Sequence, residues 1–245
     1  MITNDTTMDG IRRVQQANGP ELGLSTASGV QIIERDGLAF KDLERTGELL
    51  PYEDWRLPAK ERAKDLAQRM TIEEIAGLML YSSHQMVPPA PVGPFQGTYC
   101  GKKYQETDLP PYALSDQQKR FVTEDHIRHI LMVAVKDADT AARWSNALQA
   151  MAEALPHGIP VNISSDPRSG ARHASAEFKS SGNDVSKWPE GIGFAACFDP
   201  EIVRQFAHDA SIEYRALGIT TALGPQIDLS TEPRWMRLQD RKSVV

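Results

Sequence analysis

The fold is decided by residues 129–166, which read HILMVAVKDADTAARWSNALQAMAEALPHGIPVNISSD. The run His129 to Val135 is apolar almost throughout and is typical of a fully buried strand. Asp139 can cap a helix carrying Ala142, Leu148, Met151 and Leu155, and Gly158 can end it. A second strand, Val161 to Ser164, follows at once. The stretch therefore predicts a strand, a helix and a parallel strand.

A second unit of the same kind follows. Asp199 suits the N-cap of a helix, Pro200 its first turn and Gly218 its end. One face of this helix is apolar and carries Val203, Phe206, Ala210, Tyr214 and Leu217. The strand Thr220 to Leu223 comes next. The alternation predicts an α/β fold with parallel strands and right-handed crossovers.

Alternation alone does not separate an open doubly wound sheet from a barrel. An open dinucleotide-binding sheet requires a G-x-G-x-x-G turn after a strand, and the sequence has none there. Polar clusters instead follow two strands, at residues 164–166 and 226–228. Polar residues at the carboxyl ends of strands favour a TIM-like barrel.

Local signals also predict elements upstream of this region. A helix is expected from Pro58, with Ala63, Leu66, Ala67 and Met70 at helical spacing. Thr71 and Glu74 form a capping-box signature for a second helix, and a buried strand is expected to begin near Leu78. Residues 84–112 are rich in proline and glycine, which favours a long surface loop, and Ser115 can cap a helix through Phe121.

Residues 1–50 contain only short apolar runs, such as Val30 to Ile33. They predict an extended lead-in segment that wraps the domain and has no core of its own. Within FKDLERTGELLPYEDWR, Asp42, Gly47 and Glu53 occupy positions 1, 6 and 12 of a calcium-loop template. Thr46 and Leu50 fit that template poorly, so a polar turn is the preferred interpretation and calcium binding is left open.

Composition limits the possible partners. The chain has 33 acidic and 27 basic residues, a formal charge of -6 and no Lys/Arg cluster, which makes nucleic acid an unexpected partner. No stretch approaches the roughly 18 apolar residues of a membrane span. The opening MITNDTTMDGIRRVQQANG lacks the apolar region of a signal peptide, so localisation is left open between periplasm, secretion and cytoplasm.

Cysteine and histidine give no metal site and no cofactor site. Cys100 and Cys197 are far apart and are expected to be two unrelated buried thiols. His126 and His129 are three residues apart and lack a third ligand nearby, so they are interpreted as structural.

Asp166 comes directly after a buried strand, and Pro167 prevents a further ladder bond. A carboxylate at this place can accept hydrogen bonds from two adjacent hydroxyl groups of a sugar. An aspartate that caps a turn is an equally good interpretation of Ser-Asp-Pro. The residues alone leave both open.

Five segments, in this order and spacing, resemble family 3 glycoside hydrolases over about residues 38 to 239. They are YEDWRLPAKERAKDLAQRMTIEEIAGLML, DQQKRFVTEDHIRHILM, GIPVNISSDPRSGAR, WPEGIGFAACFDPEIVRQFAHDASIEYRALGIT and ALGPQIDLSTEPRWMR. The resemblance implies that Asp166 binds hydroxyls of the glucosyl unit at the non-reducing end. It also implies that Arg237 contributes to the sugar pocket, where a surface ion pair is the alternative.

Catalytic carboxylates are the missing part of the pattern. A retaining glycosidase needs a nucleophile and an acid/base roughly 5 to 5.5 Å apart. The resemblance places the nucleophile on a later strand, after a Lys-His pair that this sequence lacks. The chain also has Met236 where the family usually has glycine and Ser169 where many members have histidine. No catalytic residue is therefore assigned.

The last six residues, Asp240 to Val245, match one translated frame of a sequencing-library adapter. The sequence therefore predicts a lead-in at 1–50, a partial barrel domain at 51–239, about the first half of a (β/α)8 barrel, and a non-native tail at 240–245. The expected partner is the missing C-terminal part of the same protein.

The expected activity of the complete protein is hydrolysis of terminal, non-reducing β-D-glucosyl bonds, with a β-linked oligosaccharide or glucoside as substrate. The fragment itself is expected to be inactive. The alternatives are another exo-glycosidase of the family, a β-xylosidase or a β-N-acetylhexosaminidase, and a non-catalytic sugar-binding module. A dehydrogenase is disfavoured because the phosphate-binding glycine turn is absent.

Overall fold

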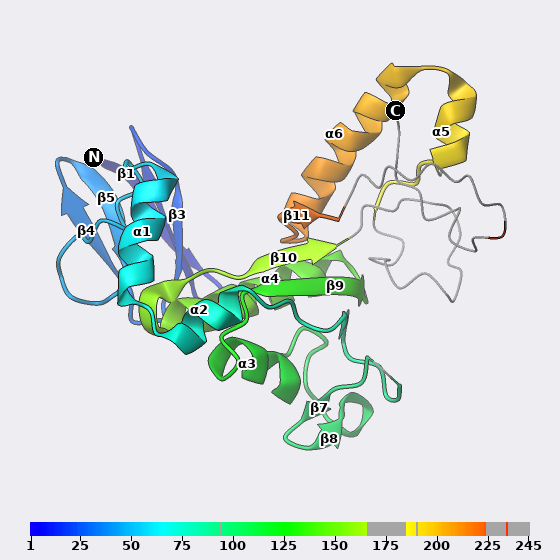
Figure 1. Cartoon of the computed structure of the whole chain (residues 1–245), viewed down its shortest axis with the longest axis horizontal. Coiled ribbons are helices and arrows are strands. Elements are labelled where there is room, and N and C mark those ends of the chain that lie inside the picture. The colour runs from blue at the N-terminus through cyan, green and yellow to red at the C-terminus, as the bar shows by residue number, and fades with distance from the viewer. Residues whose placement is uncertain (94, 166–184, 190, 224–233, 235–245) are drawn as a thin grey trace. The chain divides into compact units, whose positions relative to one another are not determined.

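The structure is a computed structural model that describes residues 1–93, 95–165, 185–189, 191–223 and 234 (Figure 1). The chain divides into two compact units. Unit 1 comprises Met1–Leu80, Gln118–Arg128 and Ala147–Val161, and unit 2 comprises Tyr81–Gln117, His129–Asn146 and Asn162–Val245.

Unit 1 begins with two small antiparallel sheets. The first contains β1 (Ile2–Met8), β2 (Ile11–Gln16) and β3 (Leu22–Ser25), and the second contains β4 (Gln31–Arg35) and β5 (Leu38–Asp42). Asp9-Gly10 forms the turn between β1 and β2, and Asp36-Gly37 forms the turn between β4 and β5. All four residues have positive φ. Two consecutive positive φ values give a turn whose twist matches that of paired strands.

These sheets enclose a hydrophobic cluster, which makes the expectation of a lead-in without a core wrong. Its buried members are Val14, Leu22, Leu24, Val30 and Ala39. The apolar residues alternate with polar ones along short strands, so no run of them is long. In β2 and β3 the buried residues alternate with exposed ones, and hairpin pairing brings the buried faces of these strands together.

The helices of unit 1 follow their local signals closely. Helix α1 (Ala59–Arg69) begins after Pro58, and α2 (Ile72–Leu78) begins with the predicted capping box of Thr71 and Glu74. The expectation of a strand near Leu78 is wrong, because α2 includes that residue. The helix α3 (Asp116–Thr123) starts directly after Ser115, as expected.

Unit 2 contains a parallel sheet of four strands in the order β6, β9, β10, β11. These strands are β6 (Gln85–Val87), β9 (His129–Val135), β10 (Asn162–Ser165) and β11 (Thr221–Ala222). Both strand–helix–strand units predicted from the sequence are present. The α/β class with parallel strands is confirmed.

The connecting helices are α4 (Ala138–Ala154), α5 (Gly191–Cys197) and α6 (Pro200–Ala216), with short 3₁₀ turns at Tyr104–Glu106 and Pro156–Gly158. Asp199 caps α6 as predicted, accepting the Glu201 N–H at 2.9 Å. The predicted cap of α4 is wrong by one half-turn: Asp137 accepts the Thr140 N–H at 2.8 Å, while Asp139 pairs with Arg143. Asp137 caps α4 because it immediately precedes the first residue of that helix.

The region between β6 and α3 is less open than a long surface loop. It contains a small hairpin of β7 (Thr98–Tyr99) and β8 (Lys102–Lys103). Asp116 holds the turn of this hairpin by accepting the N–H groups of Cys100 and Gly101 at 2.9 and 3.0 Å. These two hydrogen bonds to the Asp116 carboxylate stabilise the turn of a hairpin whose strands are too short to form a longer ladder of backbone hydrogen bonds.

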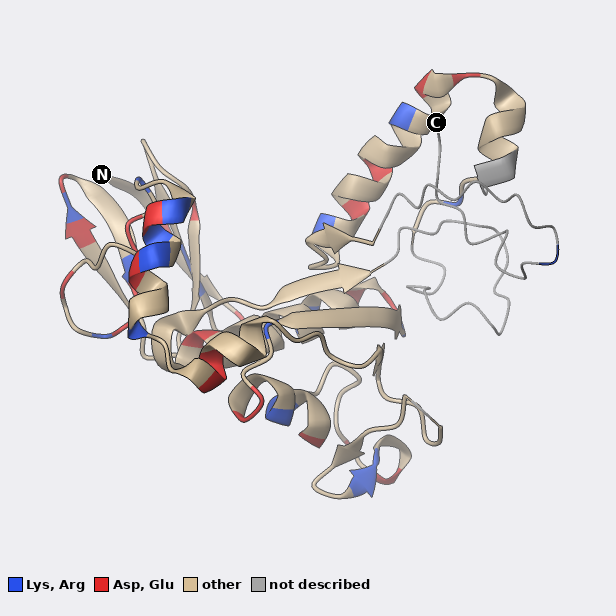
Figure 2. Ribbon diagram, in the orientation of Figure 1, with Lys and Arg blue, Asp and Glu red and all other residues tan. Residues whose placement is uncertain are grey.

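Charged residues avoid the centre of the sheet in unit 2. Figure 2 shows lysine, arginine, aspartate and glutamate on the helices and the amino-terminal strands, and none on β9 or β10. Any charge offered to a ligand at this sheet therefore comes from outside β9 and β10.

Candidate functional site

The carboxyl edge of the parallel sheet is the place where the sequence predicts ligand-binding residues. Strand β10 ends at Ser165, which is paired with Ala222 of β11 and accepts the Leu223 N–H at 2.9 Å. Asp166 follows Ser165 in the sequence. Asp166 itself, Arg237, Ser169 and Met236 lie outside the described residues.

A row of polar side chains crosses the same sheet nearer its amino edge, and the sequence analysis did not find it. Asn162 is the centre of the row: its Nδ2 lies 3.2 Å from His129 Nδ1, and its Oδ1 accepts the hydroxyls of Thr220 and Thr221 at 2.8 and 2.7 Å. Asn162 and His129 are directly paired in the register of β10 and β9. The row thus ties three neighbouring strands together.

Tyr81 and Ser164 continue this row. The Tyr81 ring stacks on His129 with 5.7 Å between centroids, and its hydroxyl donates to Ser164 Oγ at 2.6 Å. Ser164 is fully buried, and its own hydroxyl donates to the Ile130 carbonyl oxygen at 3.3 Å. Each hydroxyl has one hydrogen, so Ser164 uses its donor on the backbone and its acceptor on Tyr81.

This hydrogen-bond direction decides what the row can do chemically. Asn162 Nδ2 is a donor, so His129 Nδ1 is the acceptor in their contact. Among the described residues, neither ring nitrogen of His129 is hydrogen-bonded to Ser164, so this histidine is not placed as the base that would activate a serine nucleophile. The row is rich in hydroxyl groups that bond to one another or to backbone, and the structural interpretation of His129 stays a prediction.

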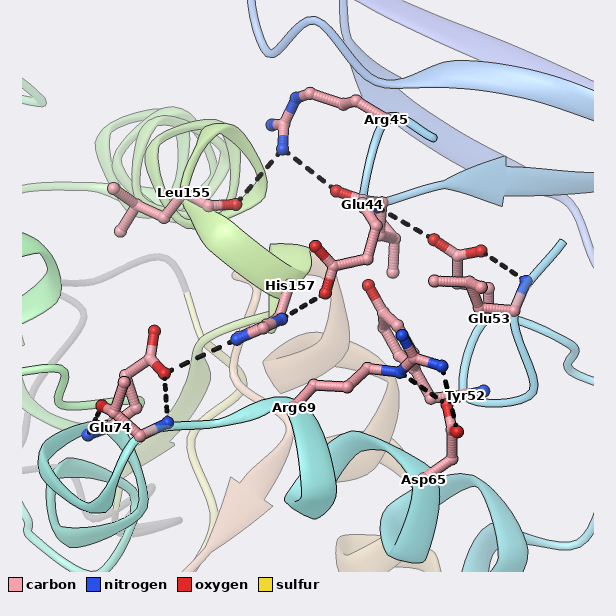
Figure 3. Close-up of polar contacts among 12 residues, drawn as sticks. Glu44, Arg45, Tyr52, Glu53, Asp65, Arg69, Glu74, Leu155 and His157 are labelled. Carbon is pink, nitrogen blue, oxygen red and sulfur yellow. Dashed lines mark hydrogen bonds and ion pairs between the residues drawn. The ribbon is translucent and has the colours of Figure 1, made fainter. Parts of the chain in front are cut away.

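A polar cluster of unit 1 surrounds His157 (Figure 3). His157 Nδ1 contacts the Glu44 carboxylate, and His157 Nε2 lies 3.5 Å from Glu74 Oε2. Glu74 also accepts the Thr71 N–H at 2.8 Å. Burial raises the pKa of Glu74, but the Thr71 N–H and the nearby histidines outweigh it and hold that pKa below its usual range.

Each of these side chains serves to hold backbone or a neighbour. Figure 3 shows that they come from the turn after β5, from the start of α2 and from the segment after α4. Beside them, Arg45 donates to the carbonyl oxygens of Glu153 and Leu155 near the end of α4. We therefore assign the His157 cluster a structural role within unit 1.

The candidate calcium loop forms a polar turn, the interpretation that the sequence favoured. Asp42 accepts the N–H groups of Thr46 and Gly47, each at 2.9 Å. Glu53 accepts those of Glu44 and Leu50, also at 2.9 Å. Burial raises the pKa of Glu53 despite these bonds. Among the described residues no group of three or more His, Cys, Asp or Glu side chains is arranged so that it could hold a metal ion.

Tyr52 lies under this turn and is almost fully buried. Its pKa is raised by burial and by the carboxylates of Glu53 and Glu44. Its hydroxyl has no hydrogen-bond partner among the described residues, while Arg69 lies 5.9 Å above its ring and pairs with Asp65 at 2.9 Å. The turn and α1 are thus joined by the contact between the Arg69 side chain and the Tyr52 ring.

Two smaller predictions are settled by the structure. Cys100 and Cys197 are both exposed, so the expectation of buried thiols is wrong. Cys100 directly follows β7, and Cys197 is the last residue of α5. His126 is structural, because it packs so closely on α2 that a Cβ at Gly77 would come within 2.6 Å of His126 Cβ.

Comparison with known protein families identifies the chain. Residues 99–242 match the family described as "Glycosyl hydrolase family 3 N terminal domain". The chain belongs to glycoside hydrolase family 3. The matched range includes β9, α4, β10 and α6, and it ends inside the segment 240–245.

Several curated proteins are similar to this family 3 chain. It is 44% identical over 211 residues to "Periplasmic beta-glucosidase/beta-xylosidase" of Dickeya chrysanthemi, covering 86% of this chain and 30% of that protein. It is 34% identical over 210 residues to "Beta-glucosidase C" of Emericella nidulans, covering 82% and 30% respectively. The chain thus spans less than a third of the length of these relatives.

A solved family 3 structure is also similar. The β-N-acetylglucosaminidase of Paenibacillus sp. str. FPU-7 matches with a TM-score of 0.45 and 23% identity, covering 64% of this chain and 24% of that one. Within the described residues, no helix is both long and apolar enough to cross a membrane.

Proposed function

We propose that this chain is the amino-terminal part of a retaining exo-glycosidase that hydrolyses terminal, non-reducing β-D-glucosyl bonds. The observation that carries the proposal is the 44% identity to a protein whose name includes β-glucosidase, together with 34% identity to a β-glucosidase C. The fragment itself is inactive, because the nucleophile and the acid/base lie in the remainder of the protein.

The four parallel strands are, in this proposal, the first four of a (β/α)8 barrel. Their spatial order follows their sequence order without a reversal, which supports a barrel over a doubly wound sheet. The barrel domain comprises residues 51–239, preceded by the segment 1–50, and residues 240–245 are a non-native tail.

Asp166 and Arg237 bind the sugar. Asp166 follows the carboxyl end of β10, the edge at which barrel enzymes place their ligand-binding groups. Its carboxylate accepts hydrogen bonds from adjacent hydroxyls of the terminal glucosyl unit, and the Arg237 guanidinium donates to hydroxyl oxygens and orients Asp166. These bonds tighten as the ring flattens toward the oxocarbenium-like transition state.

A second candidate function is β-xylosidase activity, because the name of the Dickeya chrysanthemi relative includes both activities. Xylose lacks the hydroxymethyl group of glucose. A pocket that hydrogen-bonds this group therefore discriminates strongly between the two sugars, and a pocket that leaves it unbound does not.

The test begins with the source DNA. Resequencing past codon 239 and expressing the full reading frame gives the protein that we call the complete enzyme. Its kcat/KM is then measured on an aryl β-glucoside and the matching β-xyloside. A higher value for the glucoside supports the proposal, a higher value for the xyloside supports the second candidate, and no turnover of either contradicts both.

A further inference from the structure

We propose that Asn18 is a site of spontaneous deamidation, in which its side-chain amide becomes a carboxylate without an enzyme. Asn18 and Gly19 lie in the turn between β2 and β3, and both residues are exposed. Of the five asparagines in the sequence, Asn18 is the only one followed by glycine. All the residues involved belong to unit 1, so the site is separate from the parallel sheet to which the proposed function refers.

The reaction takes place between two neighbouring residues, and asparagine is among the thermolabile residue types. The backbone nitrogen of Gly19 attacks the side-chain carbonyl carbon of Asn18. The bond from that carbon to the amide nitrogen breaks, and ammonia leaves with the proton that the Gly19 nitrogen gives up. Water then opens the resulting succinimide ring at the side-chain carbonyl to give aspartate, or at the main-chain carbonyl to give isoaspartate.

The fold leaves both reacting groups free. In the part of the chain that the structure describes, neither the Asn18 side chain nor the Gly19 N–H forms a hydrogen bond. The Asn18 side chain can therefore rotate toward the Gly19 nitrogen without breaking a bond, and glycine has no side chain to shield that nitrogen. Asn4 differs, although it is also exposed: it lies within β1, and its Nδ2 donates to Gln15 Oε1 at 3.4 Å.

Packing explains why position 19 needs a glycine. A Cβ at this position would lie 2.7 Å from Gln16 Cδ and 2.8 Å from Trp55 Cζ2. Both distances are shorter than real Cβ contacts, so any larger residue would require these side chains to shift. A larger residue would also slow the ring closure by shielding the nitrogen. The fold therefore keeps the reactive dipeptide in place.

Deamidation at Asn18 should loosen the connection between the two amino-terminal sheets. The Gln16 side chain makes this connection: its Oε1 accepts the Ala39 N–H at 2.9 Å, and its Nε2 donates to the carbonyl oxygens of Ala39 and Pro20 at 3.2 and 3.0 Å. Isoaspartate inserts an extra methylene group into the main chain just before Gly19. Because Gly19 lies directly against Gln16, we expect this insertion to displace Gln16 and weaken its bonds to Ala39.

The first experiment is peptide mass mapping of the complete enzyme after incubation in warm, mildly alkaline buffer. Replacing an amide by a carboxylate changes the peptide mass, whereas isomerisation at the Asp-Gly turns does not. We expect the Asn18 peptide to convert to a mixture of aspartate and isoaspartate, while the Asn4 peptide stays unchanged. Conversion should be slower in mildly acidic buffer, because the Gly19 nitrogen must lose its proton to attack.

The unfolded chain is the reference for this experiment. The enzyme is incubated in the same buffer with denaturant, which removes any protection by the fold. Conversion of Asn18 at comparable rates in the folded and unfolded samples supports the proposal. An Asn18 peptide that stays intact in the folded enzyme overturns it, and so does conversion of Asn4 at the same rate as Asn18.

A second measurement tests the consequence for Gln16. Hydrogen exchange of the peptide that contains Ala39 is compared before and after incubation, with Asn18→Ser as the control that cannot form the ring. We expect exchange at Ala39 to become about 3- to 10-fold faster in the deamidated wild type, as for the loss of one hydrogen bond, and to stay unchanged in Asn18→Ser. Equal exchange in deamidated and fresh wild type would overturn the link to Gln16. Neither measurement depends on catalytic activity.

Discussion

Lys41 Nζ lies 2.6 Å from Glu153 Oε1, although 112 positions separate the two residues in the sequence. The second carboxylate oxygen of Glu153 accepts the Ser25 N–H at 2.7 Å. The Glu153 side chain is 9% exposed and that of Lys41 26%. One carboxylate near the end of α4 therefore anchors two different strands of the amino-terminal sheets.

Removing this carboxylate should destabilise unit 1. Glu153→Ala leaves a partly buried ammonium group and a backbone N–H without their acceptor, and we expect a loss of about 2 to 3 kcal/mol. Denaturant unfolding of the complete enzyme, followed by circular dichroism, measures the loss. Glu21→Ala is the control, because its 3.6 Å pair with Arg13 is exposed and should contribute under about 0.5 kcal/mol. Equal effects of the two variants would contradict the anchoring role.

If the proposed function is right, residues 1–245 alone should not hydrolyse an aryl β-glucoside above background, because the proposal places the nucleophile of the covalent step outside these residues. The measurement is a colorimetric assay on the purified chain. Turnover that persists through purification and is abolished by Asp166→Asn would make Asp166 catalytic and overturn the assignment.

The same chain should aggregate or show molten behaviour when expressed alone. In the described sheet of unit 2, β6 and β11 are edge strands with one partner each, and unpaired edges promote association. Size-exclusion chromatography and thermal melting check this. A cooperative melt of a monomer would count against the view that the barrel is incomplete.

Asp166→Ala in the complete enzyme separates sugar binding from turn capping. A binding role predicts a loss in kcat/KM that corresponds to about 3 kcal/mol or more, with the covalent machinery intact. A capping role predicts a stability loss of about 1 kcal/mol with near-normal kinetics. Melting temperature and kcat/KM are measured on the same sample. An early melt with wild-type kcat/KM per folded molecule would exclude the binding role.

Asp54 should contribute to stability in a pH-dependent way. The Arg56 side chain donates to both Asp54 oxygens, at 2.9 and 2.7 Å, and holds the pKa of Asp54 below its usual range although burial opposes this. A lowered carboxylate pKa stabilises the fold above the unfolded pKa of about 3.9, and that stability is lost as pH falls through the folded pKa. The Tm difference between wild type and Asp54→Asn should thus be larger at pH 6 than below pH 4.

Asp36→Asn is the control for this pH dependence. Asp36 pairs with the same Arg56 at 3.0 Å, but its side chain is 70% exposed, so solvent screens the pair. Its effect on Tm should be smaller at every pH. A pH-independent effect of Asp54→Asn would contradict the electrostatic explanation.

Elements with local signals could be predicted from the sequence. The run His129 to Val135 matches β9 residue for residue, and Asp199 and Gly218 bracket α6 as expected. Caps and apolar runs act over a few residues, so they can be read without knowing the fold. The two Asp-Gly dipeptides of the amino-terminal hairpins are equally local signals, because Asp-Gly between short apolar runs is typical of a hairpin turn.

The polar row and the anchor at Glu153 could not be predicted in this way. Asn162 and His129 pair because two strands come into register, and Glu153 meets Lys41 because distant segments pack together. Neither residue type nor spacing indicates such partners. For Asp166 and Arg237, the binding roles remain predictions from family resemblance.

The strand order in unit 2 has a consequence for synthesis on the ribosome. Because β6, β9, β10 and β11 pair in the order in which they are made, each new strand meets a partner that has already emerged. The amino-terminal sheets differ: Ser25 and Lys41 must wait for Glu153, 128 and 112 positions later. The amino-terminal sheets therefore gain this anchor only after the chain has been synthesised as far as Glu153.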